Sequence, residues 1–195
     1  MEMIRTFVAI ELDSALQTAL HQVQDKFKRS PLSRIGRWVS PDGIHLTLKF
    51  LGDVPSDRVE DIRQAIERGC HSFAPFSISL TNPGFFPNAR KLRVVWVGVD
   101  GDVEQLSALQ ASIESELKQI GFPAEKRGFQ PHLTLARIRD QATTYEREEM
   151  AKLISTVKVD ASVSMSVQKV SLMRSDLKPT GAVYTRLAAI ALGKG

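Results

Sequence analysis

Two of the four histidines in the chain occur in the same tetrapeptide, His-Leu-Thr-Leu, at residues 45–48 and again at residues 132–135. In an extended strand, residues i and i+2 project to one face, so each copy presents an imidazole beside a hydroxyl while its leucines face a core. Imidazole, with an ordinary pKa of about 6.5, can give or take a proton at neutral pH. Two such faces on one substrate suit in-line displacement at phosphorus, with one histidine as general base and the other as general acid.

The two threonines, Thr47 and Thr134, complete this arrangement. Their hydroxyls can donate hydrogen bonds to the non-bridging oxygens of a phosphate and hold the phosphorus between the two rings. His45 and His132 are therefore the candidate acid and base. A strand histidine is often structural and threonine is a common strand residue, so the repeat of both is what favours catalysis.

A zinc site is the alternative use of two strand histidines. Zinc needs at least a third protein ligand, and the sequence has no His-Glu-x-x-His pattern and a single cysteine, Cys70. Proton transfer between two histidines and a phosphate needs no metal ion. We therefore expect neither a metal nor a cofactor.

The segments around the two copies have the same order of elements. A strand pattern at residues 5–13 precedes helical apolar spacing at residues 16–27, and residues 92–100 precede residues 103–120 in the same way. A helical pattern and a further strand follow each copy. This order predicts an internal duplication, with one domain over residues 1–195 made of two pseudo-symmetric lobes that share a central cleft. The lobes would span about 1–90 and 91–195, with the C-terminal strand segment exchanged or shared.

Capping residues suggest where several helices begin and end. Asp13 is a good N-cap for the first helix, and Thr143 with Glu146 forms a capping-box pattern before the last one. Ser56 is the expected N-cap of the helix after the first His-Leu-Thr-Leu copy. Gly69 is its expected stop.

The composition is typical of a globular protein in water, with 43% apolar and 25% charged residues. The chain contains no run of about 18 apolar residues and no basic, apolar leader at its start, so we expect no membrane span and a cytoplasmic location. A single cysteine excludes an internal disulfide framework. The net charge of +4 suits an anionic partner such as nucleic acid or a phosphate ester.

Three loops combine basic and aromatic residues, the combination that holds single-stranded nucleic acid by its phosphates and bases. For any one such loop, a solvated loop with an incidental aromatic side chain is the commoner case, and Arg127 and Phe129, just before His132, are the best candidates among them. The loops and their candidate nucleic-acid-binding residues are 26–38 with Trp38, 82–93 with Arg90, and 125–131 with Arg127 and Phe129.

Four segments together resemble a known family. RWVSPDGIHLTLKFLGDV and RGFQPHLTLAR resemble the two signature segments of the two-histidine phosphoesterase superfamily. More narrowly, they resemble its bacterial and archaeal branch, the RNA 2′,3′-cyclic phosphodiesterases, also called 2′-5′ RNA ligases. The opening IRTFVAIELD and the late SDLKPTGAVYTRL resemble that branch too, so the resemblance spans nearly the whole chain.

The resemblance implies a bilobal α/β (α+β) fold in which two antiparallel sheets line a central cleft and the helices lie outside. It implies metal-independent hydrolysis of RNA 2′,3′-cyclic phosphate ends to 2′-phosphates, with His45 as proton donor and His132 as proton acceptor. Thr47 and Thr134 would hold the phosphate. Some relatives also join tRNA halves reversibly by a 2′-5′ linkage, so the expected partner of this chain, taken as a monomer, is RNA such as tRNA fragments.

Two alternatives remain open at this point. One is a phosphodiesterase of small substrates, such as cyclic nucleotides or 2′-5′ oligonucleotides. The other is a module that binds RNA ends without turnover. The basic loops favour a polymer over a small substrate, and intact histidines and threonines in both copies favour catalysis over binding alone.

Overall fold

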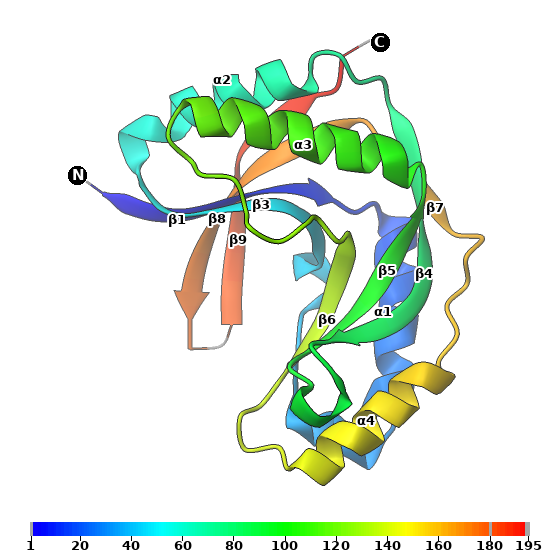
Figure 1. The fold of residues 1–195 in the computed structure, drawn as a ribbon. Helices are drawn as coiled ribbons and strands as arrows, with labels where there is room; N and C mark the ends of the chain where they lie inside the picture. Colours follow the sequence, from blue (N-terminus) through cyan, green and yellow to red (C-terminus); the bar gives the residue numbers. More distant parts are fainter. Residues whose placement is uncertain (1, 180, 194–195) are drawn as a thin grey trace.

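The computed structural model describes residues 2–179 and 181–193, and within them one sheet of nine antiparallel strands curls around the molecule (Figure 1). The strand order is β7-β4-β5-β6-β3-β1-β8-β9, and the short β2 pairs with β6. The strands are β1 (Met3–Glu11), β2 (Gly36–Trp38), β3 (His45–Pro55), β4 (Phe76–Phe86), β5 (Val94–Gly101), β6 (His132–Ile138), β7 (Ser164–Val167), β8 (Lys169–Lys178) and β9 (Gly181–Ala191).

The sheet has two halves that meet at the two His-Leu-Thr-Leu strands. β3 and β6 are joined where Leu46 pairs with Leu133. Outward from this junction the order is β3-β1-β8-β9 on one side and β6-β5-β4-β7 on the other. The predicted antiparallel α/β class is thus confirmed. The two expected sheets are halves of one continuous sheet, because the leucine pair connects them.

The third strand of each half comes from the other part of the chain. β4 pairs with β5, and β8 pairs with β1, so each crosses the middle of the sequence to reach its neighbour. The halves of the sheet therefore do not coincide with residues 1–90 and 91–195. The division of the chain into two duplicated lobes stays a prediction.

Four helices cover one face of the sheet (Figure 1). α2 and α3 lie side by side, with α2 against β8 and β9, while α1 contacts β7 and α4 contacts β4. Apolar residues of all four helices share one core with the leucines of the two repeats, which are almost fully buried. The histidine face of the sheet therefore points away from this core. The helices are α1 (Ser14–Lys28), α2 (Val59–Cys70), α3 (Val103–Gln119) and α4 (Thr144–Thr156), and the 3-10 turns are η1 (Pro31–Ile35), η2 (Pro41–Gly43), η3 (Ser56–Arg58) and η4 (Ala89–Lys91).

Two of the predicted helix starts are confirmed. The Asp13 carboxylate accepts a hydrogen bond of 2.9 Å from the backbone N–H of Leu16, as an N-cap does. Thr143 and Glu146 form both bonds of a capping box at the start of α4.

The predicted limits of α2 are wrong at both ends. Ser56 lies in a separate 3-10 turn, and α2 begins at Val59 without a side-chain cap. Gly69 lies inside α2, which ends at Cys70. Gly69 allows close packing instead, since a Cβ at this position would lie 2.8 Å from Cα of Ile113 on α3. The glycine lets two helices approach each other and does not end one.

Candidate active site

A cleft of about 1730 Å³ lies on the open face of the sheet, across the junction of its two halves. The predicted quartet of His45, Thr47, His132 and Thr134 lines this cleft. All four side chains are half-buried, whereas the leucines that alternate with them are buried on the other face. Alternation along two strands has therefore brought two imidazoles and two hydroxyls together, as the sequence predicts.

The register of β3 and β6 crosses the two motifs. Because the strands are antiparallel and pair at Leu46 and Leu133, His45 lies next to Thr134, and Thr47 lies next to His132. Each imidazole is thus paired with the hydroxyl of the other copy. A phosphate centred on the junction could meet both rings and both hydroxyls at once.

Each histidine ring is held by the backbone two residues before it. Nδ1 of His45 lies 2.9 Å from the carbonyl oxygen of Gly43, and Nδ1 of His132 lies 2.7 Å from that of Gln130. A carbonyl oxygen can only accept, so Nδ1 carries the proton and donates in both rings. Nε2 is then the nitrogen that each ring offers to a substrate. It accepts a proton when the ring is neutral and donates one when the ring is charged.

Aromatic side chains enclose His45. The Phe7 ring stacks on it at 4.6 Å between centroids, and the Tyr184 ring meets it edge-on at 4.9 Å. This burial lowers the pKa of His45 below its ordinary value, against the opposing effects of the Gly43 hydrogen bond and the Glu11 charge. In the free protein the surroundings of His45 therefore favour its neutral form.

His132 has a different aromatic environment. The Phe86 ring meets it edge-on at 5.2 Å, and the Trp96 ring is tilted at 6.4 Å between centroids. Among the residues that the structure describes, none places a ring face to face on His132 at the distance that Phe7 keeps from His45. The two histidines thus share their backbone geometry and differ in their neighbours.

The cleft is lined by more positive than negative side chains, which favours an anionic ligand. Arg37 of β2 and Arg137 of β6 are exposed and lie directly opposite each other in the sheet. Like charges in that position repel, and an anion between them would relieve the repulsion. Sequence reasoning did not single out either residue; an exposed arginine in an otherwise apolar strand was the available signal. The basic residues lining the cleft are Arg5, Lys28, Arg37, Arg127, Arg137 and Arg139, against Glu125 and Asp140.

Three of the four predicted nucleic-acid-binding side chains line the cleft. Arg127 and Phe129 do so from the loop that leads into β6. Trp38 lines it as well, but its Nε1 donates a hydrogen bond of 3.0 Å to the carbonyl oxygen of Ser33, and its ring stacks on Phe27. Trp38 is therefore anchored in the structure of the cleft wall. A contact between RNA and these three residues stays a prediction.

Arg90 is not brought to the cleft. It lies on η4, does not line the cleft, and pairs with Glu148 of α4 at 3.4 Å. The closeness of a basic and an aromatic residue in the sequence did not predict the position of Arg90, because η4 places its side chain on the outer surface.

Lys49 is a buried residue that the sequence analysis missed. Its side chain is 2% exposed, and its Nζ donates to the Glu114 carboxylate at 2.9 Å and to the carbonyl oxygen of Pro123 at 2.8 Å. Glu114 also accepts a bond of 2.9 Å from the backbone N–H of Glu125. These bonds fix the start of the loop that carries Arg127, and a lysine inside an apolar strand was the only signal in the sequence.

Neither a metal cluster nor a membrane helix is found in the part of the chain that the structure describes. Within residues 2–179 and 181–193, histidine, cysteine, aspartate and glutamate do not gather in a group of three that could hold a metal ion. In the same residues, no helix combines the length and apolar character needed to cross a bilayer.

Comparisons with known proteins give consistent matches over almost the full length. A family model described as the 2′-5′ RNA ligase superfamily matches residues 12–179. The chain is 36% identical to an RNA 2′,3′-cyclic phosphodiesterase of Methanothermobacter thermautotrophicus, over 97% of this chain and 99% of the relative. The crystal structure of Escherichia coli LigT in apo form superposes with a TM-score of 0.78 at 26% identity, over 99% of each chain. LigT complexed with 3′-AMP superposes with a TM-score of 0.77 at 26% identity, over 98% of this chain and 99% of that one.

Proposed function

The chain belongs to the 2′-5′ RNA ligase superfamily, and from that membership and its cleft we propose that it is an RNA 2′,3′-cyclic phosphodiesterase that leaves a 2′-phosphate end. The observation that carries the proposal is the crossed quartet. Two imidazoles present Nε2 to one cleft, each beside the hydroxyl of the other copy. Relatives that match over nearly their whole length bear the name of this activity.

The geometry supports a mechanism with one proton transfer at each ring. Nε2 of neutral His132 takes a proton from water as the water oxygen bonds to phosphorus. The bond between phosphorus and the 3′-oxygen breaks, and Nε2 of protonated His45 gives its proton to that oxygen. The 2′-oxygen keeps its bond to phosphorus. Thr47 and Thr134 donate to the non-bridging oxygens, and the two rings return to their first states by exchange with solvent.

The acid role of His45 requires a proton that burial in the free protein disfavours. A phosphate entering the cleft brings a negative charge next to the ring, and such a charge raises the pKa of an imidazole. We infer that His45 gains its proton as the substrate binds. The pH dependence of kcat/KM should be bell-shaped, since one ring must be charged and the other neutral.

An RNA end is the substrate class that fits the cleft best. Sites for small ligands occupy about 300 to 1000 Å³, whereas this cleft measures about 1730 Å³ and carries six basic side chains. A second candidate function is that of a phosphodiesterase of small nucleotides. The structures of LigT complexed with 3′-AMP and with ATP favour this candidate. A tRNA fragment in the cytoplasm, bound by a monomer of this chain, is the partner we propose, and reversible 2′-5′ joining would use the same two histidines.

One assay tests the proposed function. The protein is incubated with an RNA oligomer that ends in a 2′,3′-cyclic phosphate, with and without EDTA, and the product end is identified by 31P NMR. We expect a 2′-phosphate at the same rate in both samples. A 3′-phosphate product would overturn the assignment of the leaving oxygen, and a loss of rate with EDTA that zinc restores would overturn the metal-free mechanism.

The same assay distinguishes the alternatives when a 2′,3′-cyclic mononucleotide is the second substrate. A higher kcat/KM for the oligomer supports an RNA enzyme, and equal or lower values for the oligomer support the small-nucleotide enzyme. Binding of the oligomer without any turnover would identify a module that holds RNA ends.

A further inference from the structure

A carboxylate stands opposite the first catalytic histidine. Glu11 of β1 pairs with His45 of β3 in the antiparallel register. Side chains of directly opposed residues lie on the same face of a sheet, so the half-buried Glu11 is on the cleft side with the imidazole. Its charge acts on His45 in the direction that favours the protonated ring.

Glu11 is held rigidly and stays ionised. Arg186 of β9 donates to its carboxylate from Nε at 2.7 Å and from Nη2 at 3.0 Å, and the Ser171 hydroxyl of β8 donates at 2.5 Å. Burial raises the pKa of Glu11, but the bonds from Arg186 and Ser171 together outweigh it and keep the pKa below its usual value. The negative charge is therefore present at neutral pH, at a fixed place.

The corresponding position in the other half of the sheet holds a glycine. The residue opposite His132 is Gly98 of β5. A Cβ at that position would lie 2.5 Å from Cγ2 of Thr81, so the space for a side chain is already filled by the neighbouring strand. The two motifs thus match in sequence and differ in the charge that faces them.

Among the polar groups around His45, Glu11 is the anion that acts on the ring. β9 contributes the neutral phenol of Tyr184, whose pKa is raised by burial, and the Arg186 guanidinium, which is paired with Glu11. Lys169 of β8 acts on Glu11, and His132 of β6 lies across the junction. Of these groups, Glu11 is the charge that shifts the protonation of His45.

We propose that Glu11 is a positioning residue that helps His45 take up the proton it gives to the leaving oxygen, an aid that the residue opposite His132 does not supply. The aromatic enclosure of His45 disfavours a cation, and the carboxylate across the strand opposes that effect in part, together with the Gly43 hydrogen bond. The proposal rests on the proposed function, because it assigns the acid role within that site.

The test is Glu11→Gln, which removes the charge and keeps one acceptor oxygen for Ser171 and Nε of Arg186, while Nη2 of Arg186 loses its acceptor. The ring pKa of each histidine is followed by NMR in the free protein, without substrate. We expect the pKa of His45 to fall, because a negative charge that favours its protonated form is lost, with no equal change at His132. An unchanged pKa at His45, or an equal fall in pKa at both rings, would overturn the proposal.

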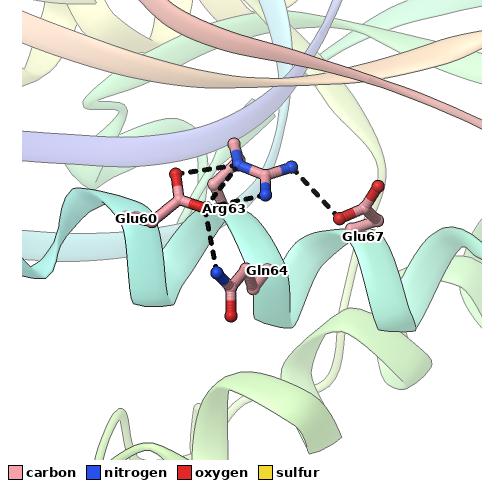
Figure 2. A network of polar contacts seen from close by, with 4 residues as sticks. All are labelled: Glu60, Arg63, Gln64 and Glu67. Carbon is pink, nitrogen blue, oxygen red and sulfur yellow. Dashed lines mark hydrogen bonds and ion pairs between the residues drawn. The ribbon is translucent and has the colours of Figure 1, made fainter.

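The matched control is Glu60→Gln on α2. Glu60 is also held by an arginine, with Arg63 donating at 2.8 to 3.1 Å and Gln64 at 2.9 Å (Figure 2). It is exposed and does not line the cleft. Glu60→Gln should leave the NMR titration of both histidines unchanged. A changed titration in this variant would show that the loss of any carboxylate has the same effect as the loss of Glu11.

The rate gives a second readout. Each unit by which the pKa of His45 falls lowers its protonated fraction about tenfold above neutrality, so kcat/KM of E11Q should fall by the matching factor at alkaline pH and stay near wild type at acid pH. A uniform loss at every pH would indicate a structural role. If E11Q does not fold, E11Q/R186Q removes both charges, and a His45 pKa at the wild-type value in that variant would also refute the proposal. Should the wild type not cleave cyclic phosphates at all, the proposed function fails, while the NMR comparison still decides the role of Glu11.

Discussion

The two halves of the cleft begin with the same four residues and build different surroundings around them. His45 and His132 both donate from Nδ1 to the carbonyl oxygen two residues before, on Gly43 and Gln130. Both offer Nε2 to the same space. At the level of the motif, the two rings are equivalent and either could act as acid or base.

The difference lies in strands that the motif does not contain. Phe7 and Tyr184 enclose His45 and lower its pKa, and Glu11 stands across from it. The second histidine faces Gly98, which carries no charge. Repeated residues thus present the same groups to the cleft, and neighbouring strands give the two rings different surroundings.

The largest expected effect comes from the histidines themselves. His45→Ala and His132→Ala should each lower turnover on cyclic-phosphate RNA by about 10² to 10⁴, because each removes a general acid or base. Both side chains are half-buried on the cleft face, so the melting temperature should change little. Turnover and thermal melts measure the two effects, and a variant near wild-type turnover would remove that histidine from the mechanism.

A second substrate separates the two roles. On a p-nitrophenyl phosphodiester, whose leaving group departs without a proton, loss of the acid should matter less than loss of the base. H45A should then lose less activity than H132A. The reverse order would exchange the roles assigned to the two halves.

The threonines come next. Thr→Val at Thr47 or Thr134 keeps the β-branched shape and removes the hydroxyl, while Thr→Ser keeps the hydroxyl. A hydrogen bond to a charged group contributes about 1.5 to 3 kcal/mol, so each Val variant should lose about tenfold to a hundredfold in kcat/KM. Each Ser variant should stay within a few-fold of wild type. Equal rates for Ser and Val would show that the hydroxyl does not touch the phosphate in that half.

A substitution of Lys49 tests whether its buried bonds stabilise the half of the sheet that carries the first motif. It lies four residues after His45, where the second copy has the buried Ala136. Lys49→Met removes its bonds to Glu114 and Pro123 and should lower the free energy of unfolding by about 1.5 to 3 kcal/mol. Chemical denaturation measures it, with Lys152→Met, which removes an exposed pair with Glu149, as the control that should change little. Equal losses would mean that the buried pair adds nothing.

The smallest effect concerns the enclosure of His45. Tyr184→Ala exposes the ring to water, and because burial lowers the pKa of His45, its exposure should raise the pKa toward the ordinary value. NMR titration should show this rise at His45 and none at His132. A fall, or no change, would mean that Tyr184 does not contribute to the burial.

The sequence predicted the common face of the four motif residues better than the surroundings of that face. Alternation along a strand is a local property, so the common face of His45 and Thr47 followed from their spacing alone. The order of strands and helices was also readable. Gly69 was misread, because the closeness of Ile113 on another helix leaves no trace in the local pattern. Arg90 was misplaced, since the direction of a loop depends on the turn that carries it.

By itself, the sequence determined the reactive groups, their common face and the helical and extended segments, because these depend on residues a few positions apart. Only the tertiary structure decided which strands are exchanged between the halves, β4 in one direction and β8 with β9 in the other, and that Glu11, Arg186 and Ser171 meet beside His45. Those contacts join residues up to 175 positions apart. Strand pairing over such distances is selected by the packing of the whole sheet, and it is this pairing that makes two identical motifs different.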